Sequence, residues 1–143
     1  MNKVTISLVL LFVLVSAILF FNDKGLSVWP AISTQSPEPE IIIFEPQPED
    51  LISSPLIIEG KVRGFWFFEA SFPISLLDGF GNVVKQDIVQ AETEWMTTDF
   101  VSFKKSLDFI LPATNEGILI LHNDNPSGLP EHDKELRIPI RFR

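Results

Sequence analysis

The sequence predicts an all-β protein, a two-sheet antiparallel sandwich of about seven strands, preceded by one N-terminal transmembrane helix. Short stretches in which apolar and polar residues alternate with a period of two recur between residues 41 and 142, which is typical of half-buried strands. Turn-forming residues separate these stretches, without a helical period or a repeat. An apolar run, broken only by Thr5, Ser7 and Ser16, precedes them. A small barrel is the alternative fold.

Composition narrows the expected class of protein. The chain has 143 residues, a formal net charge of −8 and a pI of about 4.6. An acidic surface repels phosphate groups, so nucleic acid is not an expected partner. The sequence lacks cysteine, which excludes disulfides and Cys-ligated zinc. The fold must therefore rely on its apolar core.

Residues 1–21 are predicted to be a signal anchor. As a helix, Val4–Phe21 would reach roughly 27 Å at about 1.5 Å per residue, close to the thickness of a bilayer's hydrocarbon core. Lys3 precedes the run and the charges beyond it cancel, so we expect a cytoplasmic N-terminus, a single span of the cell membrane and an extracytoplasmic domain. The alternative is a signal peptide cleaved near Val15-Ser16-Ala17, which would release a secreted protein.

Residues 22–40 are expected to form a spacer, because their serines and prolines resist helix and sheet formation. The folded domain is then expected to occupy residues 41–143. Its first element, Ile41–Phe44, reads as a short edge strand that ends at a proline-rich turn.

The stretch Leu51–Arg63 is broken by Ser53-Ser54-Pro55 and then alternates cleanly. Its predicted inward residues are Leu56, Ile58, Gly60 and Val62. Gly64 is expected to permit a bend into the next strand.

Phe65–Asp78 is predicted to be one strand with a wholly apolar inner face. The residues of that face are Trp66, Phe68, Ala70, Phe72, Ile74 and Leu76. The residues on the opposite side are Phe67, Glu69, Ser71, Pro73, Ser75 and Leu77. Gly79 and Gly81 suit a tight turn into the hairpin partner Val83–Gln90.

The polar segment Ala91–Asp99 is expected to cross from one sheet to the other. Phe100–Leu111 then resumes the alternation, with Val101, Phe103, Leu107 and Phe109 on its inner side. Lys105 interrupts that side, which indicates the end of the core or a β-bulge.

Gly117–Asn123 is apolar on both faces and reads as a central strand. Lys134–Phe142 closes the domain with Leu136, Ile138, Ile140 and Phe142 inward. Pro139 falls on the outward side, which suits an edge strand.

Three groups of residues, in this order, carry a resemblance to a known family. They are Ser54-Pro55-Leu56 and Glu59-Gly60 ahead of Trp66–Pro73; Trp95-Met96-Thr97 followed by Phe103; and Gly117-Ile118-Leu119 leading to Asn123–Gly128, then Ile138-Pro139-Ile140. Over about Ile41–Phe142 the chain resembles the GerMN-associated immunoglobulin-like (Gmad-type) domain of bacterial spore-germination and envelope proteins.

The resemblance implies an immunoglobulin-like sandwich in the bacterial envelope that acts as a binding or assembly module. It carries over no catalytic residues, and a sandwich fold alone does not define a function. An anchor and a short spacer stand where this family often has a GerMN domain, so a germination role does not follow.

Two sets of residues are candidates for partner binding. Phe67, Trp95 and Met96 lack an obvious place in the core and could form an exposed aromatic patch. Glu69 lies between Phe68 and Ala70, and its carboxylate would mark a functional acid if it were buried. Its phase points away from the core, so we expect it to be exposed or to cap a turn.

The other set is the loop that contains Asn123 and Asn125. Together with Asp124, Glu131 and Asp133, these residues offer oxygen ligands that calcium would accept. The same residues are also ordinary turn formers, so no metal is assigned to them.

The sequence gives no enzyme signature. His122 and His132 are its two histidines, and Ser127 near His132 does not by itself make a triad. We therefore expect no cofactor and no catalysis.

The predicted function is that of a membrane-tethered envelope module that contacts a protein or a cell-wall polymer through its loops or an exposed sheet face. The alternatives are self-association through an edge strand, such as Ile41–Phe44 or the C-terminal strand, and calcium-dependent adhesion. The sequence does not specify an oligomeric state.

Overall fold

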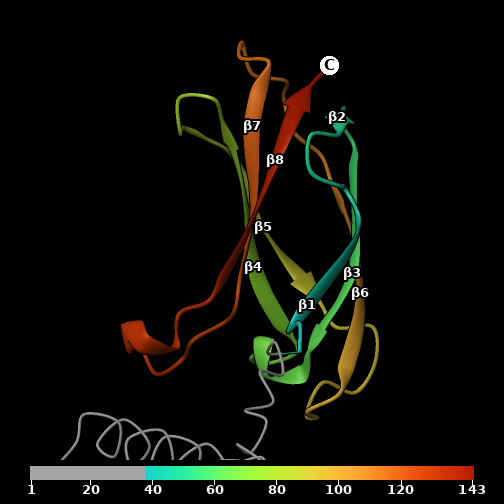
Figure 1. Cartoon of the computed structure of the whole chain (residues 1–143), viewed down its shortest axis with the longest axis vertical. Coiled ribbons are helices and arrows are strands. Elements are labelled where there is room, and N and C mark those ends of the chain that lie inside the picture. The colour runs from blue at the N-terminus through green and yellow to red at the C-terminus, as the bar shows by residue number, and fades with distance from the viewer. Residues whose placement is uncertain (1–37) are drawn as a thin grey trace, which may run out of the picture. The chain divides into compact units, whose positions relative to one another are not determined.

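A computed structural model describes residues 38–143, which form one compact unit (Figure 1). The predicted anchor, and the spacer as far as residue 37, lie outside these residues. None of the helical segments in residues 38–143 has the length and hydropathy that a membrane span requires. The elements are β1 (Ile41–Glu45), β2 (Leu51–Ile52), β3 (Leu56–Arg63), the 3-10 helix η1 (Gly64–Trp66), β4 (Ser71–Asp78), β5 (Val83–Gln90), β6 (Phe100–Leu107), β7 (Glu116–His122), the 3-10 helix η2 (Pro130–His132) and β8 (Glu135–Phe142).

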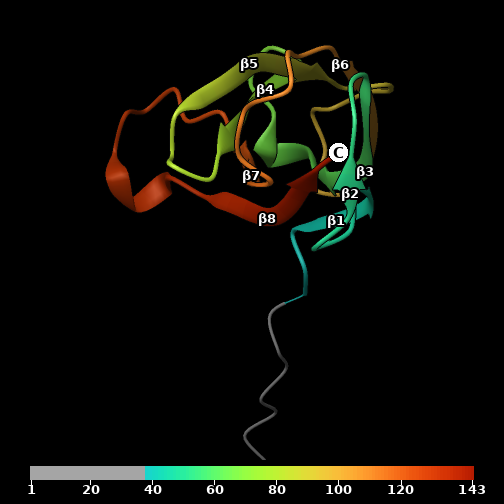
Figure 2. The same cartoon turned by 90° about the horizontal axis from the view of Figure 1, so that it is seen from above.

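The strands form two sheets that face each other (Figure 2). One sheet has the order β1-β3-β6 and the other the order β2-β8-β7-β4-β5. Neighbouring strands run antiparallel, except for the short parallel pair of β2 and β8. The two-sheet sandwich prediction is confirmed, and the barrel alternative does not fit two separate sheets.

The core lies between the sheets and follows the predicted alternation in most strands. In β3 and β8 the predicted inward residues alternate with more exposed ones as expected. The largest fully buried side chains are Phe72, Phe103, Ile58, Ile74, Leu76, Leu107, Leu119, Leu121 and Ile140.

The prediction of a single strand over Phe65–Asp78 is wrong in its first half. The chain forms η1 and then reverses at Glu69 and Ala70, whose φ angles are 49° and 61°, before β4 begins at Ser71. The alternation of inward and outward side chains does not continue through this turn. Phe67, predicted to point outward, is therefore buried, and Phe68, predicted to point inward, is exposed. Phe67 is 3% exposed and Phe68 is 40% exposed.

Phe72 is the residue on which this rearranged segment packs. The ring centroids of Trp66 and Phe67 lie 6.3 and 5.2 Å from that of Phe72, in edge-on arrangements. Phe103 from the opposite sheet lies 5.2 Å away on the same ring. Both Trp66 and Phe67 therefore belong to the core, because the turn delivers them to one end of it.

Glycine is required at position 64 because a side chain would not fit there, and not because the chain bends at this point. A Cβ atom at this position would lie 2.1 Å from the carbonyl oxygen of Thr97 and 2.3 Å from that of Trp95. The segment Ala91–Asp99, which crosses from β5 to β6 as predicted, therefore packs directly on the backbone of η1.

Lys105 marks neither a β-bulge nor the end of the core. The register between β3 and β6 is continuous, and Leu107 beyond Lys105 is fully buried. The Lys105 Nζ atom lies 3.0 Å from Asp87 Oδ2 on β5 of the other sheet. That hydrogen bond is the main cause of the lowered pKa of Asp87, so the inward charge is neutralised where the two sheets approach.

The predicted positions of strands within the sheets are confirmed for β1 and β7 but not for β8. β1 is an edge strand and β7 a central one, as expected. β8, however, lies between β7 and β2, which pairs with it at Arg141 and Phe142. Pro139 is tolerated because it lies beyond this short pairing, where its carbonyl accepts the N–H of Glu49 at 2.8 Å.

Candidate binding face

The outer faces of the two sheets differ in chemical character. On the three-stranded sheet, outward positions of β3 and β6 carry charges, and Glu59 forms an ion pair of 2.5 Å with its cross-strand partner Lys104. Lys61 and Arg63 continue this row along β3, each with its cation over the ring of Phe100. This face is an ordinary solvated surface.

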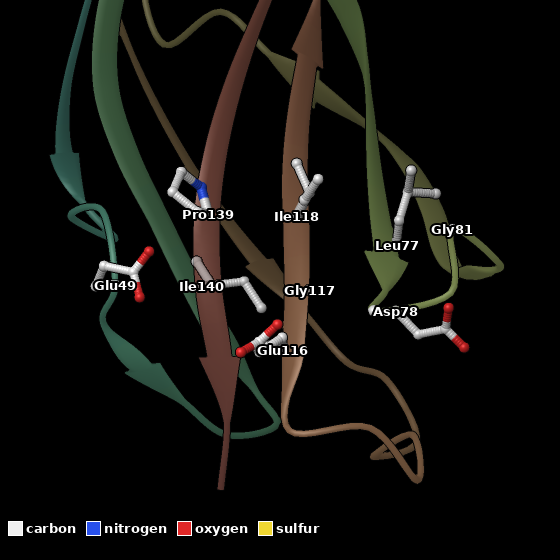
Figure 3. Close-up of a pocket in the computed structure, with 10 residues that line it drawn as sticks. Glu49, Leu77, Asp78, Gly81, Glu116, Gly117, Ile118, Pro139 and Ile140 are labelled. Carbon is white, nitrogen blue, oxygen red and sulfur yellow. The ribbon is translucent and has the colours of Figure 1, made fainter.

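The five-stranded sheet presents an apolar row on its outer side. Ile118 in β7 pairs with Leu77 in β4 on one side and with Pro139 in β8 on the other. Leu77 in turn pairs with Val83 in β5, which is 57% exposed. We call these four residues, together with Ile120, the outer apolar face; Figure 3 shows three of them side by side on neighbouring strands.

Ile120 shows that this side of the sheet buries apolar surface independently of the core. It is 4% exposed, yet it is absent from the core cluster, in which its neighbours Leu119 and Leu121 take part. Its cross-strand partners are Ser75, which is 8% exposed, and Arg137. Antiparallel sheets with one wet face show polar residues there, so an apolar outer row makes this face a candidate interaction site.

A depression of about 360 Å³ lies on the outer apolar face, over Leu77, Ile118 and Pro139. Glu49, Asp78 and Glu116 line its border, and Figure 3 shows their carboxylates along one side of the apolar row. We call these three residues the acidic border.

The three residues of the acidic border differ in the groups that surround them. Hydrogen bonds from the Asn82 side chain, and then from backbone N–H groups of the same turn, hold the pKa of Asp78 below its usual value. Glu116 has no ion-pair partner within 4 Å among residues 38–143. Arg141 is the neighbouring cation, with its Nε atom 3.2 Å from the Glu49 carbonyl oxygen and 3.9 Å from Glu49 Oε2.

The predicted aromatic patch does not form as expected. Phe67 is buried, which removes it as a surface contact because its ring packs on Phe72. Trp95 is partly buried against the core, and Met96 is 75% exposed. Glu69 is exposed in the turn before β4, on the outside as predicted.

The asparagines of the loop after β7 are engaged within the loop. Asn123 Oδ1 accepts the N–H of Lys134 at 2.6 Å, and Asn125 Oδ1 accepts the Ser127 hydroxyl at 2.5 Å. The Asn125 amide also donates to Asp133 Oδ1. In the described part of the chain, no group of three or more His, Asp or Glu side chains is placed to hold a metal ion.

Ser127 and His132 are in contact, at 3.1 Å between Oγ and Nδ1. The nearby carboxylate of Asp133 binds Asn125 instead of the imidazole, and the Ser127 hydroxyl donates to the same asparagine. The three groups form a loop-stabilising network, which lacks the acid that would orient the histidine in a triad.

The outer apolar face was missed by sequence reasoning, which placed its candidates at the opposite end of the sandwich, around η1, η2 and the β5–β6 connection (Figure 1). The signal was present in Gly117–Asn123, whose apolar residues on both faces were assigned to burial among neighbouring strands. In an antiparallel sandwich no second layer covers the outer side of a strand, so only side chains of adjacent strands can bury a residue there, as at Ile120.

A family model described as the immunoglobulin-like domain of bacterial spore germination matches residues 40–128. The matched region ends before β8, which completes the five-stranded sheet. A search of curated proteins found no match, and a search of solved structures found none.

Proposed function

Because the chain belongs to the family of immunoglobulin-like domains of bacterial spore germination, we propose that it is a non-enzymatic binding or assembly module of the bacterial cell envelope. In this proposal residues 1–21 anchor the chain in the membrane, and the domain contacts a protein partner outside the cytoplasm. The apolar run Val4–Phe21 and the proline-containing spacer support the tethering.

The observation that carries the binding role is the contrast between the two outer faces. One sheet shows charged pairs to solvent, whereas the other shows the row Pro139, Ile118, Leu77 and Val83. Contiguous exposed apolar surface marks an interaction site in soluble domains. The partner therefore docks on the outer apolar face.

Photo-crosslinking in intact cells tests this function. A photoreactive amino acid replaces Val83 on the outer apolar face or, as the matched control, Glu59 on the charged face. We expect a discrete adduct with one protein from position 83, identified by mass spectrometry, and background labelling from position 59. Equal labelling from both positions would contradict the proposal.

The second candidate function is self-association through β1. This strand is a sheet edge and carries Phe44, which is 49% exposed. Unpaired backbone groups at an edge can accept a strand of another copy. Sedimentation of the full chain in nonionic detergent distinguishes the two, since stable pairing predicts a dimer that a proline at Ile41, whose N–H faces away from β3, would dissociate.

A further inference from the structure

We propose that the partner segment on the outer apolar face is cationic: a stretch of another protein that places an apolar side chain over Leu77, Ile118 and Pro139 and basic groups against the acidic border. This inference rests on the proposed function and specifies the chemistry of the partner.

The apolar part of the site supplies the contact area. The depression of about 360 Å³ is at the lower end of the range for ligand-binding pockets, which span roughly 300–1,000 Å³. Leu77, Ile118 and Pro139, which line the depression from three neighbouring strands, offer no side-chain hydrogen-bond donor or acceptor. Such a lining selects an apolar side chain through burial of surface.

The acidic border selects the charge around that side chain. Glu49, Asp78 and Glu116 lie along one side of the apolar row (Figure 3), and Arg141 adjoins Glu49. Glu116 forms no ion pair within 4 Å in residues 38–143, although Arg141 is its cross-strand partner in β8. A Lys or Arg beside the docked apolar group would supply the cation of such a pair.

The same charges argue against other occupants. In a two-fold contact whose axis passes through the acidic border, the border would face its own image, and like charges at an interface are unfavourable. The formal net charge of −8 adds to this repulsion. Anionic polymers and anionic membrane surfaces are disfavoured for the same reason.

The test uses the full chain in nonionic detergent and three synthetic peptides of equal length. The first has leucines flanked by lysines, the second has the same leucines flanked by glutamates, and the third has lysines flanking serines. We expect binding of the first peptide, measured by calorimetry, and weakening at 1 M salt, where the Debye length falls to about 3 Å. We expect no binding of the other two.

Substitutions in the acidic border test whether these carboxylates bind the peptide. Glu116→Gln combined with Glu49→Gln should weaken binding of the lysine–leucine peptide about fivefold, the effect expected for loss of partly exposed charge pairs. The control Glu59→Gln, on the charged face, should leave the affinity unchanged. Asp78 is not substituted because its carboxylate also holds the β4–β5 turn.

Equal binding of the lysine- and glutamate-flanked peptides, unchanged affinity in the double variant, or no binding of any peptide would overturn the cationic partner. None of these results removes the adduct expected from position 83 in cells. Failure of the inference is therefore distinguishable from failure of the proposed function.

Discussion

The indole Nε1 of Trp66 donates a hydrogen bond of 3.1 Å to Oε2 of Glu40, while Lys134 Nζ lies 2.5 Å from Oε1 of the same carboxylate. Glu40, which immediately precedes β1, thereby binds Trp66 of η1 and Lys134, which immediately precedes β8. Desolvation, the largest single effect, raises the pKa of Glu40, but the hydrogen bonds from Lys134 and Trp66 together with nearby positive charge lower it on balance.

Glu40→Gln is expected to lower the melting temperature by roughly 2–4 °C at pH 7, a modest effect because the pair is partly exposed to solvent. A lowered pKa in the folded state means that the carboxylate stabilises the fold above its ordinary value of 4.5 and loses this effect as the pH falls below it. Thermal unfolding at pH 7 and pH 3 checks this. A difference that persists at pH 3 would contradict the assignment.

Phe72→Ala should destabilise the domain by about 3–5 kcal/mol, the usual cost of removing a fully buried aromatic ring. Phe68→Ala is the matched control, because Phe68 is 40% exposed, and should cost less than about 1 kcal/mol. Denaturant unfolding gives both values. A large loss at Phe68 would restore the single-strand interpretation of this segment.

Gly64→Ala should destabilise the fold by about 1–3 kcal/mol, because the added methyl group would meet two carbonyl oxygens of the β5–β6 connection. Ser106→Ala, at an exposed position of β6, serves as the control. Unfolding curves that place the two variants together would show that the connection can move away from Gly64.

Calcium is expected to leave the melting temperature unchanged. The carboxamide oxygens of Asn123 and Asn125 already accept hydrogen bonds within their loop. A ligand that binds the folded state raises its stability, so calcium binding would raise the melting temperature. Scanning calorimetry with calcium and with a chelator makes the comparison, and an upward shift would support the adhesin alternative.

Strand positions and the inner faces of β3, β6 and β8 could be predicted from sequence because alternation is a local property that sheet pairing preserves. The exchange of Phe67 and Phe68 could not, since nothing in the alternation of Phe65–Asp78 marks a turn at two non-glycine residues of positive φ. The pairing of Lys105 with Asp87 was equally hidden, because it depends on how two sheets approach.

The candidate site was recoverable in part. Leu77 fell on the outward side of its strand, and Ile118 lay in a strand apolar on both faces. The register of the strands could not be predicted from the sequence. It places Ile118 between Leu77 and Pro139, so that the three residues form one surface.

The measurement that tests the binding face most directly is the crosslink yield from position 83 in the Ile118→Ser background, normalised to folded protein. Ile118 is half-buried on the outer side, so the variant should fold, with a cost of about 1 kcal/mol. The account predicts a folded domain that no longer forms the adduct. An undiminished adduct from that folded variant would contradict it.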